Sequence, residues 1–435
     1  MFTTYQEALA WIHARLKLGM KPGLKRMEWM MARLENPEKS LKTVHIGGTN
    51  GKGSTVTFLR SILQAGGYTV GTFTSPYIEQ FNERISVNGD PISDEEILQL
   101  TNVVKPLSDE LEETDLGGPT EFEVITAMSL YYFSKMNPVD LVIYEVGLGG
   151  RLDSTNIISP MLSIITNIGL DHTAILGNTY AEIAFEKAGI IKNSTPVFSG
   201  VQQEDAIKVV KDKADEMVAP LFLLNRDFYT RSHSALQHGE KFTLENTFWT
   251  LADLEIGMIG AHQTKNAALA VMAADYLSRY SSFPLVEKEI RDGLKTAYWP
   301  GRFEILSDHP LVVMDGAHND EGIAALVHEL TTRFHNRKIH LIFTALKDKK
   351  LDKMIASLDQ VADEIVFVSF DFPRASTAAD LCALSQSQNK SANENWQSAI
   401  MSVIPKIGKN DVLVITGSLY FISIVKPFLL KFFQK

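Results

Sequence analysis

The chain of 435 residues is poor in cysteine, in excess basic charge and in long apolar runs. Its single cysteine, Cys382, cannot form a disulfide within the chain, which excludes a disulfide-stapled fold and a cysteine-rich metal site. Forty-two basic residues stand against 52 acidic ones, and the net charge of -10 argues against broad contact with nucleic acid or an anionic membrane. These absences predict a cytoplasmic protein that binds any phosphate locally.

The two ends of the chain have neither signal-peptide nor transmembrane character. His13 and Arg15 interrupt the apolar positions near the N-terminus, which have no continuous hydrophobic stretch. Lys426 and Pro427 break the apolar stretch that begins at Ser418, well short of the roughly 18 residues that a membrane span needs. We therefore expect no transmembrane helix and no membrane partner.

What the chain does contain is a series of short apolar runs, each followed by glycine or polar residues and separated by segments of helix length. This alternation predicts an α/β protein with parallel sheets and helices on both faces. Pro300-Gly301 interrupts the series, so we expect a domain over residues 1–297 with a mostly parallel sheet, and a smaller Rossmann-like α/β domain over 298–435. Residues 226–250 predict an antiparallel edge of the first domain. The expected strands cover 43–46, 68–73, 141–144, 162–165, 311–314, 339–343, 365–368 and 412–415, and helices are expected at 4–16 and 54–65.

The sharpest functional signal is a glycine-rich loop between the strand at 43–46 and the helix at 54–65. Glycines let successive backbone N–H groups face one anion, the helix N-terminus adds partial positive charge, and Lys52 adds a full one. The common G-x-x-x-x-G-K-[ST] pattern is not met, but a helix rather than a returning strand follows, which disfavours an Asn-Gly surface turn. The first domain is therefore predicted to be a P-loop ATPase domain. Its candidate phosphate contacts are Gly48, Thr49, Asn50, Gly51, Lys52, Gly53, Ser54 and Thr55.

Acidic residues near strand ends could hold the Mg²⁺ that a phosphate loop needs. Glu145 ends the strand at 141–144, and Asp171 and His172 follow the strand at 162–165. Carboxyl ends of parallel strands meet at one edge of a sheet, where ligands bind in open α/β folds. Mg²⁺ prefers carboxylate oxygens, which favours Glu145, whereas a lone histidine such as His172 is more often structural.

Five further polar residues have patterns open to a structural or a functional interpretation. Lys187 near a helix end is typical of a surface lysine that favours the helix dipole. Asn266 lies on the polar stripe of an alanine-rich helix, which could face a nucleotide or merely pack. Asp315 and His318 follow the strand at 311–314, and Arg302 lies on the linker. An exposed loop is the alternative for these three, although loops at strand ends carry function disproportionately.

Nine motifs, taken in order, resemble those of the folylpolyglutamate synthase and dihydrofolate synthase family, part of the Mur ligase superfamily. The resemblance spans nearly the whole chain. The family's phosphate loop has the shortened G-T-x-G-K form, so the departure from the generic pattern agrees with it. The motifs are GTNGKGST (48–55), FTSPYIEQFNERI (73–85), TEFEVIT (120–126), EVGLGGRLDSTN (145–156), LDH (170–172), EKAGIIK (186–192), HQTKNAALA (262–270), PGRFE (300–304) and DGAHN (315–319). Tyr77 departs from the family, where many members have histidine, and this bears on selectivity for the pterin.

The resemblance implies a role for each candidate residue. Ser75, Glu145 and His172 would hold Mg²⁺, and Lys187 would be a carbamylated lysine whose anion positions a second Mg²⁺. Asn266, Arg302 and Asp315 would contact ATP, and Lys52, Lys187 and His318 would be catalytic. The pterin-bearing substrate would lie against Phe81, Glu121, Phe122, Glu123, Val124, Leu152, Asp153 and Ser154.

The implied reaction is the ATP-dependent ligation of L-glutamate to tetrahydrofolate, and to dihydropteroate as well, by a monomer that binds only small molecules. A substrate carboxylate would take the γ-phosphoryl group to give an acyl phosphate, and the amine of glutamate would convert it to an amide. Two alternatives are a Mur-type ligase acting on a cell-wall precursor and a nucleotide-gated binding protein that is not a ligase. The absence of an Asn-Lys-x-Asp motif disfavours a GTPase-like switch.

Overall fold

The computed structural model describes residues 1–19 and 21–433, which fall into two compact α/β units. The N-terminal unit comprises Met1–Ser232, Phe242–Ile256 and Lys265–Ala297. The C-terminal unit comprises residues from Tyr298 onward, together with His233–Lys241 and Gly257–Thr264. The predicted fold class is confirmed for both units, while these two earlier segments differ from the division that the sequence predicts.

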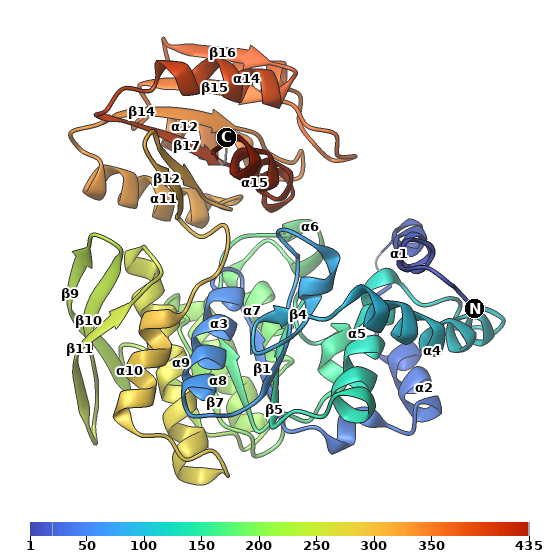
Figure 1. Cartoon of the computed structure of the whole chain (residues 1–435). Coiled ribbons are helices and arrows are strands. Elements are labelled where there is room, and N and C mark those ends of the chain that lie inside the picture. The colour runs from blue at the N-terminus through green and yellow to red at the C-terminus, as the bar shows by residue number, and fades with distance from the viewer. Residues whose placement is uncertain (20, 434–435) are drawn as a thin grey trace. The chain divides into compact units, whose positions relative to one another are not determined.

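The N-terminal unit is built on an eight-stranded sheet in the order β4-β3-β2-β5-β1-β6-β7-β8 (Figure 1). The six strands from β2 to β8 in this order are parallel. At the edge of the sheet, β3 pairs antiparallel with β2, and β4 pairs antiparallel with β3. Each of the five residues of β1 is buried, as is typical of a central parallel strand with helices on both faces. The strands are β1 Thr43–Gly47, β2 Val70–Phe73, β3 Ile85–Val87, β4 Asp90–Pro91, β5 Leu141–Glu145, β6 Leu162–Ile165, β7 Val197–Ser199 and β8 Leu221–Leu223.

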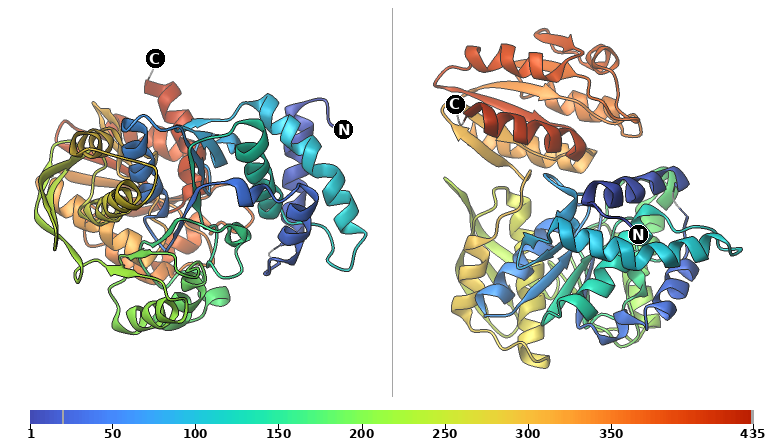
Figure 2. Two further views of the ribbon diagram at one scale, coloured as in Figure 1. Left: turned by 90° about the horizontal axis from the view of Figure 1, so that it is seen from below. Right: turned by 45° about the vertical axis from the view of Figure 1, so that its right-hand side comes forward.

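Helices pack on both faces of this sheet (Figure 2). On one face, Val124 and Met128 of α5 share a core with Phe73 of β2 and Tyr144 of β5. The helices are α1 Tyr5–Ala14, α2 Lys25–Arg33, α3 Lys52–Ala65, α4 Asp94–Glu112, α5 Glu121–Tyr131, α6 Thr173–Leu176, α7 Tyr180–Ala188, α8 Glu204–Glu216, α9 Ala261–Tyr280 and α10 Glu287–Thr296. Short 3-10 helices cover Arg15–Leu18, Pro37–Ser40, Phe81–Arg84 and Ser154–Ile157, and a π-helical turn covers Tyr132–Met136.

A separate three-stranded sheet follows β8, in the order β11-β10-β9. It comprises β9 Phe228–Leu236, β10 Gly239–Asn246 and β11 Thr250–Ile256. These strands form a sheet of their own beside the eight-stranded one. Phe242–Ile256 belongs to the N-terminal unit, where the sequence places residues 226–250, and the tip His233–Lys241 belongs to the C-terminal unit. The short connections between these strands require antiparallel neighbours, as the sequence predicts.

The tip between β9 and β10 belongs to the C-terminal unit because a buried ionic cluster fixes it there. Arg333 pairs with Glu240, whose side chain is fully buried, and donates to the carbonyl oxygen of Leu236 at 2.7 Å. Arg333 also pairs with Glu329 at 2.9 Å, and Glu329 accepts the N–H of Ala261 at 2.8 Å. A buried charge is strongly unfavourable without such partners, so the cluster depends on all of its members.

The C-terminal unit has a six-stranded sheet in the order β12-β13-β17-β14-β15-β16, in which only β12 is antiparallel to its neighbour. This is the Rossmann-like arrangement that the sequence predicts. The strands are β12 Glu304–Asp308, β13 Leu311–Met314, β14 Lys338–Phe343, β15 Glu364–Val368, β16 Lys390–Asn393 and β17 Asp411–Thr416. The helices are α11 Asp320–Arg333, α12 Leu351–Leu358, α13 Ala378–Leu384, α14 Trp396–Val403 and α15 Leu419–Phe433, and a 3-10 turn covers Ile404–Lys406.

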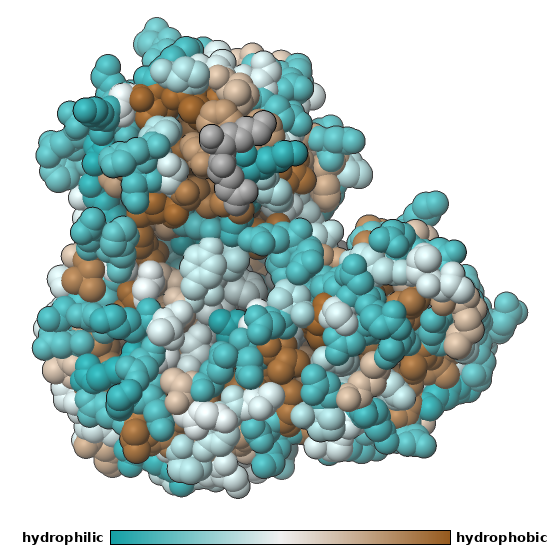
Figure 3. Space-filling view, viewed as in Figure 1, coloured by the Kyte–Doolittle hydropathy of each residue, from teal (hydrophilic) through white to brown (hydrophobic). Residues whose placement is uncertain are grey.

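Hydrophilic side chains dominate the face of the molecule in Figure 3, with hydrophobic residues in smaller patches between them. Within residues 1–19 and 21–433, no helix combines the length and the apolar character that crossing a membrane requires.

Candidate functional site

The phosphate loop joins β1 to α3 and requires glycine at two positions. Gly48 has φ 142°, and a Cβ there would lie 1.8 Å from Thr166 Oγ1. Gly51 has φ 80°, and a Cβ there would lie 2.4 Å from Asn266 Oδ1. Both positions combine a left-handed backbone with a close approach to a neighbouring side chain. This combination excludes every residue that has a Cβ atom. Asn266 of α9 therefore lies against the loop.

Residues after β6 hold this loop in place. Asn167 accepts the N–H of Thr49 with its carbonyl oxygen at 3.0 Å and the N–H of Asn50 with its side-chain oxygen at 2.8 Å. The N–H of Gly169 donates to Thr49 Oγ1 at 2.9 Å. The N–H groups of the first turn of α3 have no acceptor within the helix, so they can bind an anion at its N-terminus. Sequence analysis missed Asn167, although its place after the strand at 162–165 is a usable signal.

Two lysines converge on the phosphate loop. Lys52 donates to the carbonyl oxygens of Gly48 and Thr49 at 3.2 Å each, and Lys187 of α7 donates to the Gly48 carbonyl at 2.8 Å. Lys187 is only 4% exposed, so its interpretation as a surface lysine is wrong: the helix end that carries it is covered. Burial, together with the positive charge of Lys52, lowers the pKa of Lys187 to about 7. Its amine is therefore substantially neutral near neutral pH, the form that can react with CO₂.

The predicted Mg²⁺ ligands lie on neighbouring parallel strands and on a tight turn. Glu145 at the end of β5 accepts the N–H of Ser75, which follows β2, at 3.3 Å. His172 precedes α6 with φ 51°, and its N–H donates to the Asp171 carboxylate at 2.8 Å. Apart from residues 20, 434 and 435, the chain has no cluster of three or more His, Cys, Asp or Glu side chains arranged for a metal. The Glu145 carboxylate thus lies beside the backbone of Ser75, and a carboxylate suits Mg²⁺, which retains waters and takes phosphate oxygens as further ligands.

Asp153 organises the loop between β5 and the 3-10 helix at Ser154–Ile157. One oxygen of its carboxylate accepts the N–H and the hydroxyl of Thr155, and the other accepts the N–H of Leu148 at 2.8 Å. His45 of β1 lies with Nε2 2.9 Å from Thr155 Oγ1. Burial raises the pKa of Asp153. The carboxylate is thus engaged inside the loop, and Leu152, which is 37% exposed, is better placed to contact a substrate.

Replacing Asp153 with alanine is expected to lower the free energy of unfolding by about 3 kcal/mol, because two N–H groups and a hydroxyl lose their buried acceptor. Urea unfolding followed by circular dichroism measures the change. Asp212→Ala, at an exposed position of α8, is the control and should change stability by less than about 0.5 kcal/mol. Equal stability of the two variants would contradict the role of Asp153 in the loop.

The predicted substrate residues of α5 and its surroundings separate into two groups. Glu121 is bound by His13 at 2.8 Å, and the His13 ring lies 5.4 Å from that of Phe81. In contrast, Glu123 is 2% exposed and paired with Arg26 at 2.9 Å. Phe81, at 4% exposure, is buried like Glu123, whereas the side chain of Glu121 is 12% exposed.

The remaining predicted substrate residues are Val124, Phe122 and Ser154. Val124 is fully buried in the core. Phe122 packs against the loop after β5, since a Cβ on Gly147 would lie 2.5 Å from its ring. Ser154 begins the 3-10 helix that follows Asp153.

In the C-terminal unit, the structure brings Arg302, Asp315 and His318 together near the end of β13. Asp315 accepts the N–H of Phe303 at 2.7 Å and that of Ala317 at 2.8 Å. Burial raises the pKa of Asp315, and the nearby Arg302 opposes this shift. His318 places Nδ1 2.7 Å from the carbonyl oxygen of Gly316. Arg302, which precedes β12, thus lies close to the turn after β13 that carries Asp315 and His318.

Comparisons with known proteins identify the family. Residues 46–274 match the Mur ligase middle domain, and residues 301–419 match the Mur ligase glutamate ligase domain. A dihydrofolate synthase/folylpolyglutamate synthase of Bacillus subtilis (strain 168) is 50% identical over 426 residues, which cover 98% of this chain and 99% of that protein. The chain belongs to the folylpolyglutamate synthase and dihydrofolate synthase family of Mur ligases.

Solved structures of the family agree with this assignment. A Mycobacterium tuberculosis folylpolyglutamate synthase, complexed with ADP and AMPPCP, is 29% identical with a TM-score of 0.91 and covers 98% of both chains. A folylpolyglutamate synthase complex with AMPPCP and folate is 33% identical with a TM-score of 0.85, covering 98% of this chain and all of that one. This family member is an ATP-dependent ligase, and the two alternative functions are not favoured.

The structure of this Mur ligase also reveals buried hydroxyls that sequence analysis missed. Ser418, directly before α15, is 1% exposed, and its Oγ has no hydrogen-bond partner among the described residues. The same holds for Thr344 after β14 and for Ser376, whose N–H donates to the Ala345 carbonyl at 2.9 Å. These three hydroxyls lie near the carboxyl edge of the sheet, where ligands bind in open α/β folds. The sequence signal was Gly417-Ser418 immediately after the strand at 412–415.

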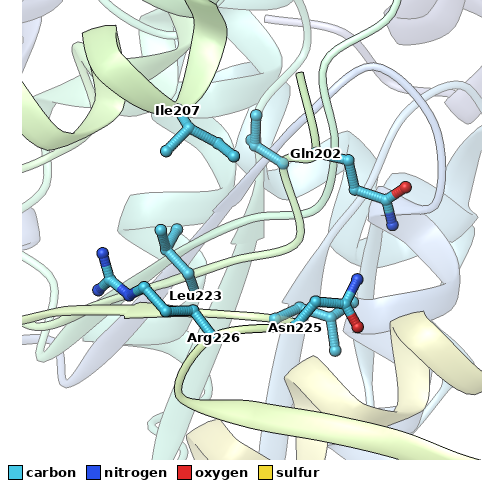
Figure 4. A pocket seen from close by; sticks show the side chains of 7 residues that line it. Gln202, Ile207, Leu223, Asn225 and Arg226 are labelled. Atoms are coloured by element: carbon cyan, nitrogen blue, oxygen red, sulfur yellow. The ribbon is translucent and has the colours of Figure 1, made fainter. Parts of the chain in front are cut away.

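A surface pocket of about 270 Å³ lies elsewhere in this Mur ligase, after the ends of β7 and β8. Ile207 and Leu223 give it an apolar wall, and Gln202, Asn225 and Arg226 are polar residues that border it (Figure 4). None of the predicted site residues lines this pocket, which is therefore distinct from the phosphate loop.

Proposed function

We propose that this ligase joins the amine of L-glutamate to the side-chain carboxyl group of a folate, and to the carboxyl group of dihydropteroate. The observation that carries the choice of substrates is the 50% identity, over nearly the whole chain, to a Bacillus subtilis protein named for both activities. The phosphate loop with its two converging lysines supports the use of ATP. We also propose that the chain acts as a monomer in the cytoplasm.

The first chemical step is transfer of the γ-phosphoryl group to the substrate carboxylate, giving an acyl phosphate and ADP. Lys52 and the N-terminus of α3 stabilise the negative charge that spreads over the phosphate oxygens. Ser75, Glu145 and His172 would hold Mg²⁺, which supplies further positive charge when bound. The amine of glutamate then attacks the acyl carbon, phosphate leaves, and the amine loses its proton as the amide forms.

In this chemistry Lys187 would act as a carbamate rather than as a free amine. Its neutral amine would add CO₂ and release one proton, which converts a neutral buried group into an anion. The neighbouring Lys52, which shares the Gly48 carbonyl with it, would then offset the new negative charge. A carbamate oxygen is a suitable ligand for a second Mg²⁺ because that ion prefers hard oxygen donors.

We further propose that the N-terminus of α15 receives a carboxylate of glutamate. The helix of 15 residues directs its N-terminal N–H groups toward the carboxyl edge of the sheet, and the unpartnered Ser418 hydroxyl lies there. An anion at this position would satisfy both groups at once.

Ser418→Ala is therefore expected to raise the KM for glutamate about tenfold while the KM for ATP stays within about twofold, since one hydrogen bond to a charged group is lost. Steady-state assays with each substrate varied in turn measure both constants. Ser423→Ala on the same helix is the matched control, because its hydroxyl donates to the Tyr420 carbonyl at 2.8 Å and is satisfied within the helix. An unchanged KM for glutamate in Ser418→Ala would place the carboxylate elsewhere.

The decisive test of function is ADP release by the purified chain with Mg-ATP and glutamate, with dihydropteroate, tetrahydrofolate or no acceptor. Product masses should rise by one glutamate on dihydropteroate and by one or more on tetrahydrofolate. Turnover with only one acceptor would assign a single activity, and turnover with neither would refute the proposal. Light scattering at the assay concentration should give the monomer mass of 48.5 kDa.

A further inference from the structure

A buried ion pair in the C-terminal unit lies beside the predicted nucleotide contacts Arg302 and Asp315. Its acidic member, Glu304, is part of the PGRFE motif, but neither residue of the pair has been given a role so far. Lys426 of α15 and Glu304 of β12 are 4% and 8% exposed, and Lys426 Nζ lies 2.8 Å from Glu304 Oε1. The hydroxyl of Tyr298 bonds to the same carboxylate oxygen. The other oxygen, Oε2, accepts the N–H of Gly301 at 2.8 Å. Glu304 thus closes the loop over residues 298–304 and ties it to the C-terminal helix.

The backbone of this loop is held in a conformation that it would not keep alone. Gly301 has φ 68° and Phe303 has φ 43°, so the two residues that flank Arg302 both have left-handed backbones. For a bulky residue such as Phe303 this conformation is strained by about 1–3 kcal/mol, and it persists only where neighbouring contacts impose it. Those contacts are the Glu304 bond to Gly301, the Asp315 bond to the Phe303 N–H, and the bond from the Gly316 N–H to the Gly301 carbonyl at 2.8 Å.

Arg302 depends on the loop for its position. Its Nη1 donates to the Gly301 carbonyl at 3.1 Å, and its positive charge opposes the rise in the pKa of Asp315. The fit is close, since a Cβ on Gly316 would lie 2.5 Å from Arg302 Nη1. A shift of Gly301 would therefore move the guanidinium relative to Asp315.

We infer that Lys426 and Glu304 are positioning residues for the nucleotide, acting through Gly301 to hold Arg302 beside Asp315. This inference rests on the proposed contact of Arg302 and Asp315 with ATP. The cation of Lys426 keeps the Glu304 carboxylate in place, and the carboxylate keeps the turn at Gly301 closed. Loss of the pair loosens the turn, and the cost falls on nucleotide affinity rather than on binding of the folate.

The Tyr298 hydroxyl remains a donor, since burial and the adjacent Glu304 carboxylate raise its pKa to about 12. Lysine and arginine both supply a cation, so Lys426→Arg retains the pair, whereas Lys426→Met retains only the aliphatic stem.

The test uses the full-length chain and the ATP analogue AMPPCP with Mg²⁺, with binding measured by titration calorimetry. Lys426→Met should weaken AMPPCP binding about tenfold, since a displaced contact loses much of its effect, while the KM for tetrahydrofolate stays within about twofold. Lys426→Arg should bind within about threefold of the parent chain. Lys431→Met, at an exposed position of the same helix, should bind like the parent.

A double-mutant cycle shows whether Lys426 acts through Arg302. Arg302→Ala combined with Lys426→Met should bind AMPPCP no more weakly than Arg302→Ala alone, because the residue to be positioned is already absent. Additive losses, or full affinity in Lys426→Met, would overturn the inference.

Two further outcomes are separable. If Lys426→Met fails to fold, the variant Lys426→Met/Glu304→Gln removes both charges and avoids an unpaired buried carboxylate, and it should show the same loss of AMPPCP affinity; parental affinity in this variant would overturn the inference. A chain that binds AMPPCP with the expected pattern but never transfers glutamate would refute the proposed function and leave the positioning role intact.

Discussion

Lys187→Ala is expected to lower the rate of ADP release by about a hundredfold or more, since it removes the buried group proposed to hold a second Mg²⁺ at the phosphate loop. The assay contains saturating tetrahydrofolate, glutamate and Mg-ATP. Lys208→Ala, at an exposed position of α8, is the matched control and should retain full activity. Full activity in Lys187→Ala would exclude the carbamate.

The pH dependence of the parent chain distinguishes a carbamate from a simple ammonium ion. Only the neutral amine adds CO₂, and the pKa of Lys187 is lowered to about 7 by burial and by Lys52. Below pH 7 the ammonium form prevails and carbamylation is lost, so activity should fall as the pH decreases. Added bicarbonate should restore part of it, and a short carboxylate such as formate should partly rescue Lys187→Ala. Activity that is independent of bicarbonate at low pH would argue for the unmodified lysine.

Gly48→Ala is expected to abolish detectable ATP-dependent turnover and to lower the free energy of unfolding by about 2–4 kcal/mol, because strain and overpacking add at one position. The new methyl group would meet Thr166 Oγ1 at 1.8 Å, and the carbonyl of Gly48, which accepts from both lysines, would have to move. Activity assays and urea unfolding measure the two effects.

Gly67→Ala separates backbone strain from crowding. Gly67 has φ 85°, but a Cβ there would have nothing within 4 Å. This control should lose about 1 kcal/mol of stability and keep its activity. If Gly48→Ala were as mild as Gly67→Ala, the close approach to Thr166 would have no role in shaping the phosphate loop.

Local patterns were sufficient to predict the parts of the site that depend on strand ends. Each of the eight predicted strands is present within two residues, and Glu145 ends β5 where the alternation of elements predicts it. These features follow from β-branched runs, glycine breaks and the rule that parallel strands share a carboxyl edge. The residues carry the signal within a short window, so no tertiary information is needed.

Features that depend on distant packing could not be predicted in this way. Lys187 has the sequence pattern of an exposed helix end, but it is buried and contacts Gly48, 139 residues away. Asp153 is engaged inside its own loop rather than toward a substrate, because the acceptors it offers match donors at Leu148 and Thr155. That β9, β10 and β11 form a sheet of their own was not predicted, because strand propensity predicts a strand but not the sheet that it joins.

The ionic cluster around Arg333 imposes an order of events during synthesis of the chain. Glu240 leaves the ribosome 93 residues before Arg333 (333 − 240 = 93), which corresponds to roughly 5–20 seconds at ordinary elongation rates. The hairpin tip at 233–241 therefore waits in solvent, its carboxylate hydrated, until α11 has been made. The C-terminal unit cannot form around this tip before the ribosome has passed residue 333. The ionic cluster therefore forms only when α11, made later, supplies Arg333 to the Glu240 carboxylate made earlier.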